Sequence, residues 1–339
     1  MPSLSKGAER PIIDSVSPFA AIAGGDVQVR GKNFTHAPRP SVAIGGVLAS
    51  LVVGSNRYVV ARVPDSARRG ELIVSNGEVD SEPAAIALGA LVVDGLHPVA
   101  SPVVDVLGNC YSTFSGSRGQ KTPVAVYRVD PGGEMTPFLN DLMNATGLAF
   151  DNSGVLHISS RFDGIVYRAT QSGEMSVYVE GMGVATGIAF DENGNLFVGD
   201  RAGTIFKISP SRQIYVFATL EPSISAYHLM FGPEGYLYVT GPTTSSFDAV
   251  YRISTAGEVE VFYRGLGRPQ GMAFDADGNL FVAASLEGRK GIVKITPERE
   301  ASLYLSGPNI VGCAIGPRGD LLITTTGALY RVDGGLRAL

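Results

Sequence analysis

Short apolar runs separated by turn residues recur along most of this chain. TGLAFDNSGVLHISS begins at Thr146, TGIAFDENGNLFVGD at Thr186 and QGMAFDADGNLFVAA at Gln270, and weaker copies begin at Ser101, His228 and Gly312. The aligned glycines lie 46, 40, 41, 43 and 41 residues apart, at Gly108, Gly154, Gly194, Gly235, Gly278 and Gly319. A period of about 40 residues is typical of the four-stranded blades of a β-propeller.

Each repeat contains four predicted strands, which we call a to d in chain order. In the third repeat these are residues 186–190, 195–199, 203–209 and 213–219. All are short, rich in β-branched and aromatic residues, and bounded by turn residues. The Asp-x-x-Gly sequence between strands a and b predicts a hairpin that begins at the Asp and needs a left-handed residue at the Gly. No segment has a sustained 3.6-residue period, so we expect almost no helix.

The last repeat lacks a fourth strand, because only GGLRAL follows ALYRVD. Residues 90–96, ALVVDGL, resemble the strand d endings of other repeats and precede the first repeat. We expect this N-terminal strand to complete the sixth blade, which removes an open sheet edge. The prediction is a six-bladed β-propeller over residues 88–339.

The first part of the chain does not follow the repeat. Residues 1–10 are predicted to form an N-terminal tail. Residues 11–87 contain about seven strand-like runs separated by turn signals, which is enough for a small immunoglobulin-like β-sandwich. The predicted fold class is therefore all-β, with a sandwich followed by a propeller.

Composition limits the function classes. Apolar residues make up 45% and charged residues 17% of the chain, which argues against disorder. The net charge of −5 argues against nucleic acid as a partner, and no apolar run reaches the length of a membrane span. The two cysteines, Cys110 and Cys313, are too few for a disulfide framework or a zinc site, and we expect buried free thiols. No export signal is visible, which favours a cytoplasmic location.

Residues Pro11 to Phe34, PIIDSVSPFAAIAGGDVQVRGKNF, resemble the IPT/TIG family of immunoglobulin-like domains. The resemblance lies in Pro18, in the pair Gly24-Gly25, and in Gly31 with Phe34. Pro18 is expected to end an edge strand, and Phe34 to cap the core. The family often lies outside bacterial cells, so an extracellular location is the alternative.

The repeats resemble the propellers of NHL proteins and of gluconolactonase and regucalcin, most clearly at Gly187–Val198 and Gly271–Val282. The resemblance implies a channel mouth at which lactonase-like members hold a divalent metal with Glu, Asn and Asp. Here Thr146, Thr186 and Gln270 replace the Asn and Asp, and no Glu occurs near Ala100. Neutral side chains cannot supply the charge that a hard cation such as calcium needs. We therefore expect no metal and no cofactor, with a divalent metal only if the chain is a lactonase-like enzyme.

Candidate ligand-binding residues come from the same mouth. The residue before the strand a glycine is expected to face it, which gives Thr146, Thr186, Tyr227 and Gln270. His228 replaces the glycine itself, and a Tyr-His pair could bind a polar ligand or act as an acid-base pair. Loops between strands b and c vary most between blades, and Arg161 and Arg201 hold equivalent places there. The set of candidates is Tyr227, His228, Gln270, Thr146, Thr186, Arg161, Arg201 and His97.

Each candidate also has a structural interpretation. The two arginines could pair with neighbouring acids, and Asp151, Asp191 and Asp275 are interpreted as hairpin residues rather than a carboxylate ring. No catalytic constellation or metal set is recognisable. The leading hypothesis is a non-enzymatic recognition or scaffolding protein that binds a protein, peptide or glycan at the mouth. The alternatives are a metal-dependent lactonase-like hydrolase with a rearranged site and a purely structural module, and the sequence gives no oligomeric state.

Overall fold

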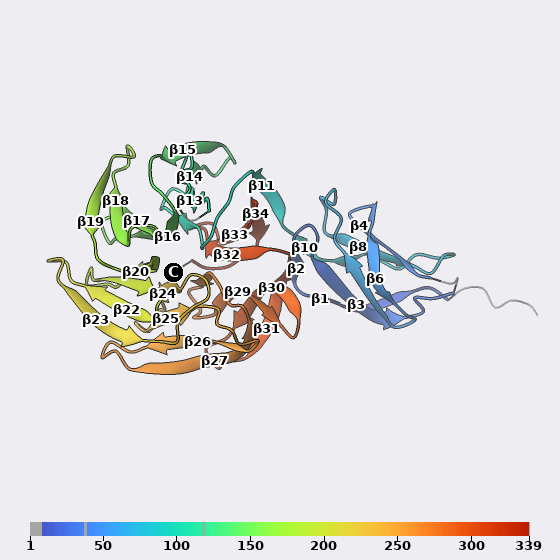
Figure 1. Cartoon of the computed structure of the whole chain (residues 1–339). Coiled ribbons are helices and arrows are strands. Elements are labelled where there is room, and N and C mark those ends of the chain that lie inside the picture. Colours follow the sequence, from blue (N-terminus) through green and yellow to red (C-terminus); the bar gives the residue numbers. More distant parts are fainter. Residues whose placement is uncertain (1–8, 37–38, 118, 339) are drawn as a thin grey trace, which may run out of the picture. The chain divides into compact units, whose positions relative to one another are not determined.

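A computed structural model describes residues 9–36, 39–117 and 119–338. The regular elements among these residues are 34 strands, which confirms the all-β prediction (Figure 1). No helix in this described part is long and apolar enough to cross a membrane. The contacts divide the chain into two compact units, of which the first extends to Ala90 and also contains Leu303–Pro308.

The first unit is a sandwich of two four-stranded antiparallel sheets. In order across the first sheet, the strands are β1 (Ile12–Ser17), β3 (Asp26–Lys32), β7 (Tyr58–Arg62) and β6 (Ser50–Gly54). In the second sheet, they are β5 (Val47–Leu48), β4 (Ser41–Ile44), β8 (Glu71–Ser75) and β9 (Ala84–Ala85). Two short strands, β2 (Ala20–Ala21) and β10 (Ala87–Leu88), pair in parallel with each other. Within the same unit, Ala20 and Ala21 also pair in parallel with Leu305 and Ser306 of β31 (Ala301–Ser306).

The core of the sandwich follows from two-residue alternation. Val27 and Val29 of β3 point inward and are fully buried, whereas Arg30 and Lys32 are exposed. Phe34 joins the same core and is fully buried, as expected. Strand β1 is an edge strand that ends just before Pro18, which also agrees with the prediction.

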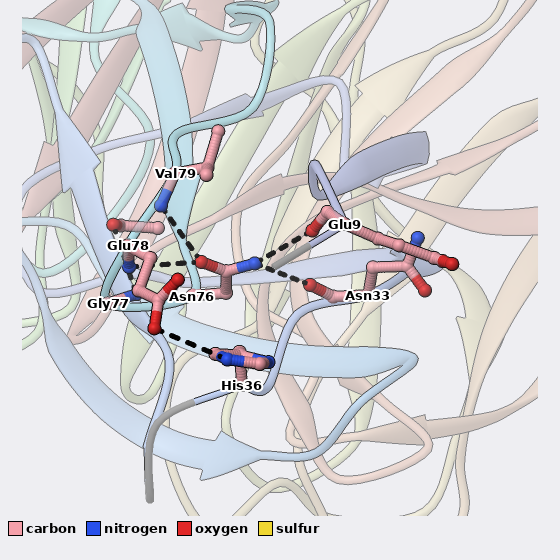
Figure 2. Close-up of polar contacts among 8 residues, drawn as sticks. Glu9, Asn33, His36, Asn76, Gly77, Glu78 and Val79 are labelled. Carbon is pink, nitrogen blue, oxygen red and sulfur yellow. Dashed lines mark hydrogen bonds and ion pairs between the residues drawn. The ribbon is translucent and has the colours of Figure 1, made fainter. Parts of the chain in front are cut away.

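A buried amide orders one end of the sandwich (Figure 2). The side chain of Asn76 is only 1% exposed, and its Oδ1 accepts hydrogen bonds from the Glu78 and Val79 amides at 3.1 and 3.0 Å. Its Nδ2 donates to the Glu9 carbonyl at 2.9 Å. On the surface beside it, His36 lies 3.3 Å from a carboxylate oxygen of Glu78. These contacts satisfy a buried polar side chain and hold a turn, so the cluster is structural.

In the second unit, blades 1, 2, 3 and 6 are separate four-stranded sheets, whereas the strands of blades 4 and 5 belong to one larger sheet, and all of them surround a common centre (Figure 1). Blade 1 contains β12 (Val103–Val104), β13 (Cys110–Thr113), β14 (Val126–Val129) and β15 (Met135–Leu139). Blade 2 contains β16 (Ala145–Phe150), β17 (Leu156–Ser160), β18 (Ile165–Ala169) and β19 (Met175–Val179). Blade 3 contains β20 (Ala185–Phe190), β21 (Leu196–Asp200), β22 (Thr204–Ile208) and β23 (Ile214–Thr219).

The remaining blades vary the same plan. Blade 4 contains β24 (His228–Phe231), β25 (Leu237–Thr240), β26 (Asp248–Ile253) and β27 (Val259–Gly267). Blade 5 contains β28 (Met272–Phe274), β29 (Leu280–Leu286) and β30 (Arg289–Ile295), and β31 holds the strand d place in its repeat. Blade 6 contains β32 (Ile310–Ile315), β33 (Asp320–Thr325) and β34 (Ala328–Asp333), with β11 (Ala90–Asp94) beside β34. The N-terminal strand therefore completes the sixth blade, as predicted.

The blades pack through a repeated aromatic cluster. In blade 3, Phe197 of strand b contacts Phe217 of strand d and Phe231 of the next blade, with ring centroids 4.9 and 5.1 Å apart. Tyr111 and Tyr238 hold the place of Phe197 in blades 1 and 4 and make equivalent contacts. In blades 2 and 3, the residues of strand b are buried, whereas strand d is more exposed. This difference in burial explains why the repeated sequence pattern is clearest in strands a and b.

The a–b hairpins have the predicted chemistry. Asp191 Oδ1 accepts hydrogen bonds from the amides of Asn193 and Asn195 at 3.0 and 2.8 Å, and Gly194 has a φ of +76°. Asp151 and Asp275 make the same two bonds. These carboxylates therefore form turns, as interpreted from the sequence.

The C-terminal residues continue past β34 along these hairpins. The Leu336 amide donates to the Gly319 carbonyl at 2.9 Å, and the Ala276 amide donates to the Arg337 carbonyl at 2.8 Å. Arg337 also pairs with Asp277. We call this end of the propeller the hairpin face, and the opposite end, where strands a begin and strands b end, the mouth.

Candidate binding site at the propeller mouth

The mouth positions expected to face a ligand are largely buried in the wall. Thr146 and Thr186 are 1% and 2% exposed. Thr146 Oγ1 donates to the Asn144 carbonyl at 2.9 Å, and Thr186 Oγ1 donates to the Gly199 carbonyl at 2.8 Å. The Tyr227 amide in turn donates to Thr186 Oγ1 at 3.1 Å. The structure thus brings Thr186 and Tyr227 together, but as a bond between neighbouring blades.

Tyr227 is a packed side chain. It is 2% exposed, and its hydroxyl donates to the Glu221 carbonyl, while burial raises the pKa of the phenol. A Cβ on Gly199 would lie 2.9 Å from the Tyr227 Cβ, and one on Gly241 would lie 2.6 Å from its ring. The two glycines therefore make the space that the ring fills.

His228 is 5% exposed, and burial lowers its pKa from 6.5 to about 4. The imidazole is therefore neutral at neutral pH. Gln270 is half-buried, and its carbonyl accepts a hydrogen bond from Thr240 Oγ1 at 2.6 Å. No hydrogen bond joins His228 to Tyr227 or Gln270 among the described contacts, so the expected Tyr-His pair is not aligned as an acid-base pair.

Strands a come very close together around the channel, as the contacts between blades 5, 6 and 1 illustrate. A Cβ on Gly271 would lie 2.8 Å from the Gly312 Cα, and one on Gly312 would lie 2.5 Å from the Ser101 Cα. Blades 5, 6 and 1 therefore meet through nearly bare backbone. This leaves no room for a ligand between these three strands.

The two arginines of the b–c loops differ in their contacts. Arg161 Nη2 donates to the Gly116 carbonyl at 3.1 Å and lies 3.4 Å from Ser115 Oγ, so it holds the b–c loop of blade 1. Arg201 is exposed, and its Nε donates to the Ser223 carbonyl at 3.3 Å. His97 is also exposed, and its ring centroid is 6.0 Å from that of Phe114. Arg201 and His97 are thus the predicted residues that are most accessible.

The structure adds residues that the repeat pattern did not single out. Asn144 is 1% exposed, accepts a hydrogen bond from the Gly119 amide at 2.8 Å and donates to the carbonyls of Gly116 and Ser117. Phe162 and Phe247 lie on b–c loops and are 44% and 68% exposed. A large aromatic residue in a variable loop was the available signal for the latter two. Together with Arg201, they are accessible side chains on the b–c loops of three successive blades.

Two carboxylates at the mouth act on the backbone. Asp200 Oδ1 accepts a hydrogen bond from the Val184 amide at 2.9 Å. Asp248 is 3% exposed, and its Oδ1 accepts from the Thr243 amide and hydroxyl at 3.1 and 2.7 Å. The described residues contain no group of three His, Cys, Asp or Glu that could hold a metal ion.

Both cysteines are buried free thiols in the structure, as predicted, and burial raises the pKa of each to about 12. A thiol with a raised pKa is a poor nucleophile at neutral pH. Neither thiol therefore adds a nucleophile to the site.

Comparisons with known proteins agree with this architecture. Residues 11–85 match the family model of the IPT/TIG domain. No curated protein matches the chain. A solved auxiliary nutrient binding protein from Bacteroides thetaiotaomicron is similar over 95% of this chain and 97% of its own, with 13% identity and a TM-score of 0.57.

Two other solved structures resemble mainly the propeller. A gluconolactonase from Xanthomonas campestris is 14% identical over 73% of this chain and 89% of its own, with a TM-score of 0.58. Virginiamycin B lyase from Staphylococcus aureus is 19% identical over 71% of this chain and 82% of its own, with a TM-score of 0.52. At these identities the likeness shows the fold. Residues 11–85 therefore match the IPT/TIG domain, and the rest of the chain has a propeller fold that is also seen in a gluconolactonase.

Proposed function

We propose that this protein is a non-enzymatic recognition protein that binds a protein, peptide or glycan at the mouth of its propeller, without a cofactor. The observation that carries this proposal is how the polar side chains at the mouth are used. Thr146, Thr186 and Tyr227 are buried and hydrogen-bonded to backbone, so they are not available for proton transfer to a ligand. The accessible groups, by contrast, include Phe162, Phe247 and Arg201, and this supports a binding role.

The binding surface would consist of Phe162, Phe247 and Arg201 on three b–c loops. Exposed aromatic and arginine side chains are the groups that contribute most to recognition surfaces. Loops on a rigid scaffold are the usual place for such groups. The similarity to an auxiliary nutrient binding protein, which extends over both parts of the chain, also supports a binding role.

The test uses the full chain against immobilised glycans and a displayed peptide library. Phe247→Ser and Arg201→Ser are expected to weaken binding to any hit by at least about tenfold, which is about 1.4 kcal/mol. Val216→Ser is the matched control, because Val216 is 67% exposed but lies on the outer strand β23. Binding that is unaffected by both mouth changes would contradict the proposal.

The alternative is a metal-dependent lactonase-like hydrolase, which is favoured by the similarity to a gluconolactonase. It predicts a stoichiometric divalent ion by elemental analysis and hydrolysis of lactones that a chelator abolishes. Lactone hydrolysis at enzymatic rates that is lost in Tyr227→Phe or in a His228 variant would replace the binding proposal with this one.

A further inference from the structure

The hairpin face of blades 1 and 2 contains a cavity of about 680 Å³, far from the mouth along the strands. Its walls come from the a–b hairpins of the two blades, from strands b, c and d of blade 1, and from the c–d turn of blade 2. Cavities of about 300–1,000 Å³ are typical of small-molecule sites. The whole cavity lies within the propeller unit.

The cavity exists because blade 1 departs from the repeat. Strand β12 has only two residues, whereas the corresponding strands β16 and β20 have six each. This shortening is at the mouth end, because Asp105 begins the hairpin at the same place in the repeat as Asp151 does in blade 2. At the cavity itself, Val104 holds the place of Phe150, and its smaller side chain leaves space. The weak copy of the repeat that begins at Ser101 therefore belongs to blade 1, which lines the cavity.

The tip of this hairpin also differs from the others. Val106 and Leu107 occupy it and are 92% and 76% exposed. The equivalent pairs in the other repeats are Asn152-Ser153, Glu192-Asn193, Pro233-Glu234, Ala276-Asp277 and Pro317-Arg318. Two large aliphatic side chains in water at a turn have no role in packing this domain, and they form a rim of the cavity.

The basic residue of strand c is used differently here as well. In blade 4, Arg252 pairs with Glu260, which lies opposite it on strand d. In blade 1, Thr136 lies opposite Arg128, and Arg128 forms no ion pair with any described residue. Its guanidinium lines the cavity beside Tyr111. Arg128 thus interacts with Tyr111, while no described acid pairs with it as Glu260 pairs with Arg252.

The other polar groups of the lining are mainly neutral. Asp105 is satisfied internally, since its oxygens accept from the Leu107 and Asn109 amides and from the Asn109 and Tyr111 side chains. Ser153, Thr170 and Gln171 add hydroxyl and amide groups, and Phe138 and Phe150 add aromatic walls. Neutral hydroxyl and amide groups both donate and accept, as sugar hydroxyls do, and aromatic rings suit the apolar faces of sugar rings.

We propose that this cavity is a binding site for a neutral oligosaccharide of two or three rings, separate from the mouth. The rings lie between Phe138 and the Val106-Leu107 tip, while Arg128 and Gln171 hydrogen-bond to hydroxyl groups. An anionic ligand is disfavoured, because the lining contains the two carboxylates of Asp105 and Asp151 and a single cation, Arg128.

The test is calorimetry and saturation-transfer NMR on the full chain with maltotriose, cellotriose, xylotriose and mannotriose, and with trigalacturonic acid as a charged probe. At least one neutral trisaccharide is expected to bind with a Kd below about 1 mM. Two cavity variants, Arg128→Met and the double change Val106→Asn with Leu107→Ser, are expected to weaken it by at least about tenfold. The double change copies the exposed tip of blade 2 and so leaves folding intact.

Arg168→Met is the matched control, since Arg168 is the exposed strand c residue of blade 2 and should leave binding within about twofold. The proposal is overturned if no neutral trisaccharide binds, if the charged probe binds better, or if binding survives both cavity variants. Survival would place the sugar elsewhere, and Phe247→Ser would then show whether it occupies the mouth. A negative result for sugar binding at the cavity therefore does not contradict ligand binding at the mouth. A negative result at the mouth likewise does not contradict the cavity proposal.

Discussion

His228 makes the stability of the propeller depend on acid pH. It holds the position that is glycine in four other blades, at Gly147, Gly187, Gly271 and Gly312. The imidazole is buried at the start of β24, and desolvation lowers its pKa from 6.5 to about 4. The unfolded chain therefore takes up a proton near pH 6.5, whereas the folded chain resists protonation until about pH 4.

The direction and size of the effect follow from this difference. Stability is independent of this group above pH 6.5 and falls as the pH drops toward 4. A difference of about 2.5 pKa units corresponds to about 3.4 kcal/mol in total, at about 1.4 kcal/mol per unit. About 2 kcal/mol of this is expected to be lost between pH 7.5 and pH 5.

The assay is guanidinium unfolding at a series of pH values, followed by circular dichroism because the chain has no Trp. The comparison is between the wild type and His228→Gly, which restores the residue of the repeat. His157 is also buried with a lowered pKa, but it is present in both proteins and cancels in the comparison. The wild type should lose about 2 kcal/mol more than the variant between pH 7.5 and pH 5. Parallel curves for the two proteins would refute the assignment of a buried, neutral His228.

Two further predictions concern the packing of the mouth. Gly312→Ala places a Cβ 2.5 Å from the Ser101 Cα, so it should lower the free energy of unfolding in guanidinium by at least about 2 kcal/mol. The control is Gly327→Ala, which should change this free energy little because nothing lies within 4 Å of the added Cβ. Equal effects of the two changes would contradict the close approach of blades 6 and 1. Asn144→Ala removes the bonds to the loop at Gly116–Gly119, and it should cost about 1–3 kcal/mol and speed proteolysis in that loop, as seen by mass spectrometry of the fragments. Unchanged cleavage there would show that the loop does not depend on Asn144.

Much of the fold was predictable because it is repetitive. Six copies of one pattern with a spacing near 40 residues require six similar units, and the short last copy requires a strand from elsewhere. The hairpin Asp and Gly residues were predictable for the same reason, since their turn chemistry is local. Residues 11–85 match the IPT/TIG family model, in agreement with the motif around Pro18 and Phe34.

The candidate site was predictable only as a location. The sequence placed Thr186 and Tyr227 at the start of strand a, but the contacts of their side chains depend on the neighbouring blade. Thr186 reaches the backbone of Gly199 and Tyr227, and Tyr227 fills the space that Gly199 and Gly241 leave, so both are wall residues. Such contacts join residues tens of positions apart, which a repeat pattern does not encode.

By itself, the sequence determined the strands, the number of blades and the closing strand, because these follow from local alternation, turn residues and copy number. Only the tertiary structure decided which polar groups are satisfied and which are accessible. Arg161 and Arg201 look equivalent in sequence, but one holds the loop of blade 1 and the other is exposed. The cavity beside Arg128 likewise required the structure, since a hollow arises from the fit between two blades. The physical reason is that exposure and hydrogen-bond satisfaction are properties of packed neighbours rather than of chain order.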